Sequence, residues 1–508
     1  MQSSNISNIK VGYAAVLLSA AVLYIATCAP GSLWQDSGMY QYRIWQNDIE
    51  GKLGLALSHP LYHITGIIVK YIPIGEYGYR INLISAICAA ISVANIFLLL
   101  RLWLGRNMPA VIAAITLALS HTMWQHASIA EVYTSYTALF TAELIFLLQY
   151  FRSRRIGYLC LLGLFNGLAI ANHMWAVIAL TCYLVLMIVL LAQKQIRLKH
   201  LGVIAGLWIV GAMPYGYLII SKYIETGDFT ATLVSALFGN SWQGAVLNIR
   251  FLTNMRLLIT LVKENMIFIA YNFPTPNAIF FFAGLYALKK SAPSRGFRYI
   301  FLALLILFFI FAFRYTVPDR YAFFIPFYCL ASILIGIGFN MLACGSNRRI
   351  PTCIVFILAL LPIPIYIIAP ITAQNRGFKL TRREVPHREE YTWFLQPWKT
   401  GYDGAERFAS EALAGVENAA IIIADGTTVY PLWNIQEIKG LRKDVEIISE
   451  HRNYRNRIPL PSVDTIGELM AERTIYVVSP EAGYCPDYLL ERYDFIRAGP
   501  IYRVVNRQ

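Results

Sequence analysis

Charged residues are scarce in this chain of 508 residues. They make up 14% of it, whereas 57% of the residues are hydrophobic and the mean hydropathy is +0.52. This composition is far too apolar for a soluble protein, and the chain is far too long for a simple membrane anchor. The sequence therefore predicts a polytopic α-helical membrane protein.

The chain also lacks the motifs of several common site classes. Seven of its eight cysteines lie in or beside apolar segments, and Cys485 stands alone in the C-terminal region, so there is neither a disulfide framework nor a CxxC metal site. The sequence contains no GxGxxG motif and no P-loop. These absences exclude a cysteine-based metal site and the usual nucleotide-binding loops.

Long apolar segments are abundant, and eleven of them are long enough to cross a membrane. They lie near residues 11–29, 81–100, 108–125, 132–150, 156–172, 174–192, 201–221, 271–288, 299–313, 321–343 and 351–371. After the last of these segments, the composition becomes mixed and charged. We expect a membrane domain at residues 1–372 and an exported domain at residues 373–508.

Acidic residues are missing from alternate connections between the apolar segments, and basic residues gather there instead. By the positive-inside rule these connections are cytoplasmic, which places the N-terminus inside and everything after Thr372 outside. Because these charges account for the whole formal excess of +14, the basic balance reflects topology and gives no reason to expect nucleic-acid binding. The basic residues are Lys10, Arg101, Arg106, Arg152, Arg154, Arg155, Lys194, Arg197, Lys199, Lys289, Lys290, Arg295, Arg298, Arg348 and Arg349.

The first outer connection contains an acid close to the membrane. Asp36 lies about two turns beyond the apolar run that ends near Ala29, so we expect its carboxylate at the water boundary. It either acts on lipid-borne groups or caps a short helix predicted over residues 39–49. A second short helix is predicted over residues 60–71, capped by Ser58, and both helices fit the membrane–water interface.

Other polar residues on the outer side each have two interpretations. Glu131 is either functional or a cap of the next helix, and the tight Asn172-His173 connection either binds a substrate or satisfies helix ends. Arg320 forms a local salt bridge with Asp319, or else Arg320 or Arg314 holds a phosphate. Glu143 is the one acid in the middle of an apolar segment, where it needs a partner inside the bundle.

The C-terminal region predicts a small α/β domain. Strand-like runs at residues 420–424, 445–449, 474–478 and 502–505 alternate with helix-like runs at residues 403–413, 465–472 and 486–493. The sequence Asp425-Gly426-Thr427-Thr428 follows the first strand, where α/β sheets often bind ligands, although it is equally readable as a plain turn. A polar region of residues 246–268 reads as one further interfacial helix.

Several short motifs occur in the order typical of one family. They are Trp34-Gln35-Asp36-Ser37-Gly38, Ser58-His59-Pro60-Leu61-Tyr62, Tyr79-Arg80-Ile81-Asn82-Leu83, Ala130-Glu131-Val132-Tyr133 and Asn172-His173. On these motifs, which cover roughly residues 30–180, the chain resembles the polytopic proteins related to the transmembrane O-mannosyltransferase of animals, within the GT-C glycosyltransferase superfamily. Many relatives read His-Pro-Pro-Gly where this chain has His59-Pro60-Leu61-Tyr62.

The resemblance implies an inverting glycosyltransferase that moves a sugar from a polyprenyl-phosphate donor to a hydroxyl of a protein, glycan or lipid acceptor. The reaction would occur outside the cytoplasm, at the periplasmic or outer face of the inner or plasma membrane, or in the lumen of the endoplasmic reticulum. Membrane lipids would surround it, and no nucleic acid would take part. The donor is a substrate, and neither a cofactor nor a metal is expected, because side chains alone can neutralise a leaving monophosphate.

The same resemblance assigns expected roles to individual residues. Asp36 matches the acid of the first outer loop and is the expected general base, and Glu131 would orient the acceptor or assist Asp36. The candidates to bind the donor phosphate or another part of the substrate are His59, Arg80, His173, Arg320, Asp319, Trp34 and Tyr133.

Two rival functions remain open from the sequence alone. A transporter or lipid flippase would place polar residues and broken helices near the bilayer midplane, whereas here the polar residues gather on one outer surface and only Glu143 favours this rival. A catalytically inactive scaffold would not need to keep both Asp36 and Glu131.

Overall fold

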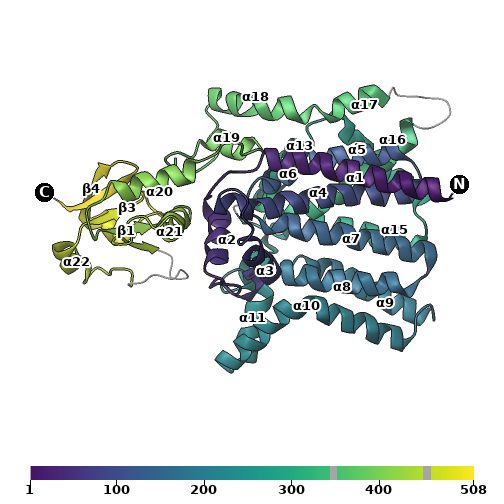
Figure 1. Cartoon of the computed structure of the whole chain (residues 1–508), viewed down its shortest axis with the longest axis horizontal. Helices are drawn as coiled ribbons and strands as arrows, with labels where there is room; N and C mark the ends of the chain where they lie inside the picture. The colour runs from purple at the N-terminus through teal and green to yellow at the C-terminus, as the bar shows by residue number, and fades with distance from the viewer. Residues whose placement is uncertain (1, 318, 344–351, 450–458, 508) are drawn as a thin grey trace.

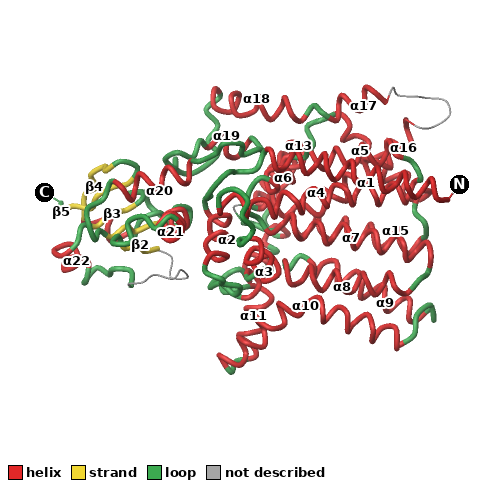
Figure 2. Tube along the Cα trace, in the orientation of Figure 1, coloured by secondary structure: helices red, strands yellow, loops and turns green. Residues whose placement is uncertain are grey.

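Helices dominate the protein, and strands appear only near its C-terminus. The structure, a computed structural model, describes residues 2–317, 319–343, 352–449 and 459–507. A bundle of long helices carries an α/β unit at one end, while the N-terminus lies at the opposite end (Figure 1). Every described strand lies in that α/β unit (Figure 2).

Each of the eleven predicted segments contains helix. The bundle consists of α1 (Gln2–Ala26), α4 (Tyr77–Leu104), α5 (Asn107–Ala118), α7 (Val132–Ser153), α8 (Ile156–Asn172), α9 (Ala176–Ala192), α10 (Leu198–Thr226), α14 (Phe280–Ser291), α15 (Arg295–Arg314), α16 (Ile325–Ala343), α17 (Thr352–Ala359) and α18 (Pro362–Asn375). Six described helices are long and apolar enough to cross a membrane. The protein is thus a multi-pass membrane protein, and the count of eleven spans stays a prediction.

Three of the predicted segments are broken in the structure, and one of them, segment 351–371, divides into α17 and α18. Segment 108–125 divides into α5 and α6 (His121–Ala127), where the Ser120 hydroxyl donates to Leu117 O instead of continuing the helix. Segment 271–288 contains the end of α13 (Met255–Asn272) and the start of α14. The helix is interrupted between α13 and α14 because Pro274 and Pro276 have no backbone N–H to donate.

Small residues let neighbouring helices of the bundle approach closely. A Cβ added at Gly167 of α8 would lie 2.2 Å from Trp208 O of α10, and one at Gly211 of α10 would lie 2.3 Å from Leu164 O of α8. Such contacts are the usual way in which membrane helices pack, since lipid offers no hydrophobic drive between them. Gly167 and Gly211 therefore let α8 and α10 pack closely along one side of the bundle.

Short helices cover the end of the bundle that faces the α/β unit. They include α2 (Gln35–Trp45), α3 (Pro60–Val69), α6, α11 (Phe229–Phe238) and the 3₁₀ turn η4 (Arg320–Phe324). The expected start of the first helix at residue 39 is wrong, because α2 begins at Gln35. For α3 the N-cap residue is His59 and not Ser58, and its side chain makes no cap hydrogen bond.

The predicted interfacial helix over residues 246–268 is also divided. It consists of α12 (Gln243–Val246), the 3₁₀ turn η2 (Arg250–Leu252) and α13, with a bend of 109° between residues 243–252 and 255–272. The Asn254 side chain accepts from Leu257 N and so starts a new helix at that point. The preceding loop, which the sequence predicts on the outer side, contains α11 and the last turns of α10.

The C-terminal unit is a mixed sheet with helices. Its strands β1 (Ile421–Ala424), β2 (Glu446–Ser449), β3 (Ile475–Val477), β4 (Tyr493–Ala498) and β5 (Ile501–Asn506) follow the order β2-β1-β3-β5-β4. Strands β2, β1 and β3 run parallel, whereas β5 is antiparallel to both β3 and β4. The small α/β domain expected from the sequence is therefore present.

The predicted strands and helices of the C-terminal region are confirmed. The four predicted strands are present, and the three predicted helices are α20 (Gly404–Ala414), α22 (Ile466–Glu472) and α23 (Asp487–Arg492). The sequence did not predict β4, which is a largely exposed edge strand, or α21 (Val429–Ile438). Pro431 lies in the first turn of α21, where its missing N–H is tolerated. One hydrophobic cluster continues from the bundle into α20 and α21. That residues 373–508 form a separate domain stays a prediction.

Candidate active site

Three acidic residues from distant segments converge at the end of the bundle that faces the α/β unit. Asp36 lies in the first turn of α2, Glu131 precedes α7, and Asp319 precedes η4. Their charges are close enough to interact, and the Ser37 hydroxyl joins α2 to Glu131 Oε1 at 3.1 Å. The structure therefore assembles the two predicted catalytic acids, together with Asp319, into one cluster.

Neither of the helix-cap interpretations is correct. Trp34 occupies the N-cap position of α2, so Asp36 lies inside the helix. Glu131 does stand at the N-cap of α7, but its side chain makes no cap hydrogen bond. Both carboxyl groups are therefore directed to something other than helix termination.

The three carboxyl groups differ in their tendency to hold a proton. Burial, followed by the charges of Asp36 and Asp319, raises the pKa of Glu131 well above its usual value and so favours its protonated form. Asp36 keeps access to solvent, yet the surrounding protein desolvates it. This desolvation, with a further contribution from Asp319, raises the pKa of Asp36 to about 7. Asp36 is thus the group that exchanges a proton near neutral pH.

Two histidines stack face to face next to this cluster. The rings of His59 and His173 are 5.0 Å apart with an interplanar angle of 17°. Burial lowers the pKa of His59 to about 4 and the pKa of His173 well below its usual value, so both imidazoles are neutral. A neutral imidazole can donate a hydrogen bond to a phosphate but cannot neutralise its charge.

The hydrogen-bond partners of the two rings assign their tautomers. His59 Nδ1 lies 2.8 Å from Asn172 O, which can only accept, so Nδ1 carries the hydrogen and Nε2 has none to donate. Trp175 N donates to His173 Nδ1 at 3.1 Å, which leaves the hydrogen on His173 Nε2. Of the two, His173 is therefore the one able to donate to a substrate oxygen.

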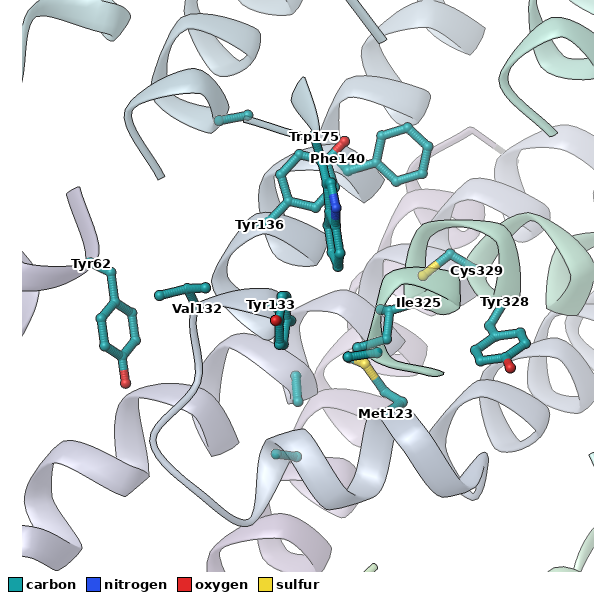
Figure 3. Close-up of a cluster of buried hydrophobic side chains, with 14 of the residues drawn as sticks. Tyr62, Met123, Val132, Tyr133, Tyr136, Phe140, Trp175, Ile325, Tyr328 and Cys329 are labelled. Carbon is teal, nitrogen blue, oxygen red and sulfur yellow. The ribbon is translucent and has the colours of Figure 1, made fainter. Parts of the chain in front are cut away.

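Tyr133 connects the acids to an aromatic layer. Its hydroxyl donates to Asp319 Oδ2 at 3.2 Å, and its ring stacks on Trp175 with centroids 4.9 Å apart. Tyr136 and Phe140, one and two turns further along α7, extend the same layer (Figure 3). Tyr133 is therefore held rigidly while its hydroxyl faces Asp319.

The predicted arginines have other partners in this structure. Arg320, which is 5% exposed, pairs with Glu264 of α13 and lies over the ring of Phe268, so of the two alternatives the local salt bridge with Asp319 is wrong. Arg314 donates to Val246 O. Arg80 donates to Lys70 O at 2.5 Å, which places its guanidinium at the end of α3.

Trp34 faces away from the acids. It is 1% exposed, its indole N–H donates to the Tyr402 hydroxyl, and its ring packs against Phe408 at 5.4 Å. Both partners belong to the C-terminal region, so Trp34 joins α2 to that region. Its predicted contact with substrate stays untested.

Two other sequence-based alternatives can be compared with the structure. Glu143 has partners inside the bundle, since Tyr183 donates to Oε2 at 2.9 Å and Asn166 donates to Oε1 at 3.4 Å. Asp425 is 2% exposed, pairs with Arg383, and accepts from Thr427 N at 2.6 Å. The Asp425 sequence therefore forms a closed turn, as the plain-turn interpretation expects.

Sequence reasoning missed several residues around the site. Ser37 holds Glu131, Glu264 holds Arg320, and the ring of Tyr40 lies edge-on to His59 at 5.9 Å and to His63 at 5.7 Å. A helix start at Gln35 would have revealed Tyr40, because positions 36 and 40 share a helix face. No signal in the sequence pointed to Glu264.

A cavity of about 1050 Å³ lies beside α2. Its walls come from α2, the loop of residues 46–55, the end of α10, and α21, and its lining includes side chains of both charges. These charged residues are Arg43, Asp48, Glu50, Lys52, Lys222, Glu225 and Glu437. In the described part of the chain, no group of three His, Cys, Asp or Glu residues is arranged to hold a metal ion. Metal dependence stays untested.

Comparison with known proteins agrees with the predicted resemblance. Residues 56–196 match the family model described as Protein O-mannosyl-transferase TMEM260 N-terminal domain. The Protein O-mannosyl-transferase TMEM260 of Mus musculus is 24% identical over 230 residues, which cover 43% of this chain and 31% of the mouse protein. The match therefore spans less than a third of that relative.

Solved structures share the fold of the whole chain. The apo crystal structure of ArnT from Cupriavidus metallidurans has a TM-score of 0.59 at 14% identity and covers 97% of this chain and 98% of its own. The structure of the same protein bound to undecaprenyl phosphate has a TM-score of 0.58 at 14% identity and covers 97% of both chains. At this identity the likeness shows the fold alone. The predicted resemblance to the O-mannosyltransferase family is thus confirmed for residues 56–196, and the chain has the fold of ArnT.

Proposed function

We propose that this protein is an inverting glycosyltransferase that moves a sugar from a polyprenyl-phosphate donor to an acceptor hydroxyl on the extracytoplasmic side of its membrane. One observation carries the proposal: Asp36, whose pKa burial raises to about 7, keeps solvent access and lies in one cluster with Glu131 and Asp319. A carboxylate with this pKa suits a general base at neutral pH. The family match and the undecaprenyl phosphate bound by ArnT support the class of donor.

In the proposed reaction, one proton moves to Asp36 and one electron pair leaves with the polyprenyl phosphate. The acceptor oxygen attacks the anomeric carbon and gives its proton to the Asp36 carboxylate. The bond between the anomeric carbon and the phosphate oxygen breaks, and its electron pair leaves with polyprenyl phosphate. Attack opposite the leaving group inverts the anomeric configuration. Glu131, which is protonated, orients the acceptor by hydrogen bonding.

The leaving phosphate needs charge and hydrogen-bond donors. Arg320 supplies the positive charge when its guanidinium leaves Glu264 and binds the phosphate instead. The side chain of Glu264 is 49% exposed. His173 Nε2 supplies a neutral donor. His59 instead holds the Asn172 connection in place, because its Nδ1 hydrogen is already used there.

A polar acceptor would approach through the cavity beside α2. Met39, one turn after Asp36, forms part of its wall, and three basic and four acidic side chains line it. Such a balanced polar lining suits a hydroxylated acceptor from the aqueous phase, whereas a lipid tail needs an apolar surface.

The test is a transfer assay with purified protein in detergent or lipid. Polyprenyl-phosphate sugars labelled in the sugar are incubated with membrane extract, and labelled product is sought with wild-type protein and with Asp36→Asn. We expect wild-type protein to release polyprenyl phosphate and label an acceptor. Absence of transfer from every polyprenyl-phosphate donor would reject the proposal.

The transporter alternative loses its one supporting observation. Glu143 was its only argument, and this residue is satisfied by Tyr183 and Asn166 within the bundle. We therefore carry no second candidate function.

A further inference from the structure

Residues of the C-terminal region hold the backbone on both sides of Asp36. Gln35 N donates to Thr427 O at 3.3 Å, and Asn434 Nδ2 donates to Gly38 O at 3.1 Å. Thr427 lies in the turn after β1, and Asn434 lies on α21, which packs beside α2 (Figure 1). Asp36, the proposed base, thus lies between two hydrogen bonds whose partners are far apart in the sequence.

The first of these bonds stabilises an unusual backbone conformation. Gln35 has φ 50°, in the left-handed region that residues other than glycine seldom adopt. Strained backbone of this kind persists where the surroundings fix it, and it collects at functional sites. The turn that accepts from Gln35 is itself fixed, because Asp425 accepts from Thr427 N and Thr428 N and pairs with Arg383.

The second bond is buried and specific. Asn434 is 0% exposed, and its amide crosses from α21 to the first turn of α2. At Gly38 an added Cβ would lie 2.3 Å from Leu33 O and 3.1 Å from Tyr430 Cβ. The glycine that follows Asp36 therefore permits the close approach of α21, which explains its place in the Trp34–Gly38 motif.

We propose that Asn434 is a positioning residue for Asp36 and that the C-terminal region, through Asn434 and the Thr427 carbonyl, is part of the active unit. The catalytic consequence rests on the proposed function, whereas the brace itself is a property of the fold. Without the Asn434 amide, the first turn of α2 is free to shift, and the carboxylate loses its alignment with the acceptor oxygen. Small displacements of a positioned group reduce the rate of the chemical step.

Asn434→Ala tests this role, with Gln436→Ala as its matched control. Gln436 lies two residues further on the same helix, is 2% exposed, and donates to Arg442 O and Val445 O, both at 2.8 Å, within the C-terminal unit. Both variants remove a buried amide from α21, but only Asn434→Ala releases α2.

We expect Asn434→Ala to lower kcat at least about 10-fold while the KM for the donor changes less than about twofold. Gln436→Ala should lower the thermal midpoint to a similar extent and keep kcat within about twofold of wild type. Equal kcat values for Asn434→Ala and wild type would overturn the inference. So would an equal loss of kcat in Gln436→Ala, since the effect would then be one of stability.

A second variant serves if Asn434→Ala does not fold. Tyr402→Phe removes the hydroxyl that accepts from the Trp34 indole but keeps the ring that packs against Trp393 at 4.7 Å. It loosens the residue just before Gln35, so we expect a smaller loss of kcat, about threefold to tenfold. An unchanged kcat in Tyr402→Phe would then count against the brace.

Amide hydrogen exchange separates the brace from the proposed reaction, because it needs no substrate. We expect the amides of residues 36–40 to exchange faster in Asn434→Ala than in wild-type protein and Gln436→Ala. Unchanged protection there would overturn the inference. If wild-type protein uses no donor while exchange rises in Asn434→Ala alone, the proposed function fails and the brace stands.

Discussion

Tyr133 donates a hydrogen bond of 3.2 Å to Asp319 across 186 residues of chain, and through Asp319 it influences the proposed base. Burial raises the pKa of Asp319, whereas this hydrogen bond lowers it and so favours the charged form; that charge adds to the effect of burial in raising the pKa of Asp36. Charge at one acid therefore sets the protonation of another.

This coupling predicts a shift in the pH profile. In Asp319→Asn the negative charge beside Asp36 is gone, so the pKa of Asp36 falls and the acid limb of kcat/KM moves to lower pH. Tyr133→Phe should move the limb in the same direction by a smaller amount. Tyr136→Phe is the control, because the Tyr136 hydroxyl is buried without a hydrogen-bond partner. A limb that stays in place in Asp319→Asn would disprove the coupling.

Replacement of Asp36 itself separates catalysis from folding. Asp36→Asn keeps the size and polarity of the side chain, so expression and thermal stability should be near normal. Transfer should fall at least ~100-fold, because an amide cannot take the proton of the attacking hydroxyl. Glu131→Gln should have a milder effect, since Glu131 acts as a protonated hydrogen-bonding group. If folded Asp36→Asn keeps most of its activity, Glu131 becomes the leading candidate for the base.

Arg320 and Glu264 give a paired test of donor binding. If the guanidinium exchanges Glu264 for phosphate, Arg320→Ala should raise the KM for the donor about 10-fold or more. Glu264→Gln removes the competing carboxylate, so it should leave that KM unchanged or lower it. The comparison uses initial rates at varied donor concentration. A rise of KM in both variants would instead show that the ion pair serves the fold.

The Glu143 cluster should affect stability and leave transfer unchanged. Tyr183→Phe removes one hydrogen bond to Glu143 within the bundle, for which we expect about 1 kcal/mol of stability to be lost. Thermal unfolding in detergent and a transfer assay on the same preparation measure the two effects. A large loss of kcat at unchanged stability would reopen a direct role for Glu143.

The orientation in the membrane is tested with tags. A tag after Arg155 should be cytoplasmic, whereas one after Gly239 should be exported, because basic residues retain their connections inside. Protease protection in intact cells and in permeabilised cells distinguishes the two sides. Cleavage of the Arg155 tag by protease added to intact cells would overturn the scheme.

Hydrophobic segments and charge patterns were enough to predict most of the fold. Apolar length predicts a helix from its own residues, and the strands of the C-terminal unit have similarly local signals. Local signals fail at the ends and breaks of helices, such as α2 and the Pro274-Thr275-Pro276 break. They also fail at α21, which was not predicted.

The candidate site was only partly predictable from the sequence. Asp36 and Glu131 stood out because acids are rare beside apolar segments. For Arg320 the sequence left open a salt bridge with Asp319 or a bound phosphate, whereas its partner in the structure, Glu264, lies on α13. Side-chain partners of this kind depend on the packing of distant helices, which one sequence without homologues does not specify.

The hydrogen bond from Asn434 to Gly38 joins residues that are 396 positions apart, and this separation imposes an order of events during biosynthesis. A ribosome adds Asp36 early, but Asn434 is added only when most of the chain has been made. Until then the first turn of α2 lacks its brace, so a nascent or truncated chain holds the acid without its alignment. Under the proposed function, we therefore expect an unfinished polypeptide to be inactive in transfer from lipid-linked sugar.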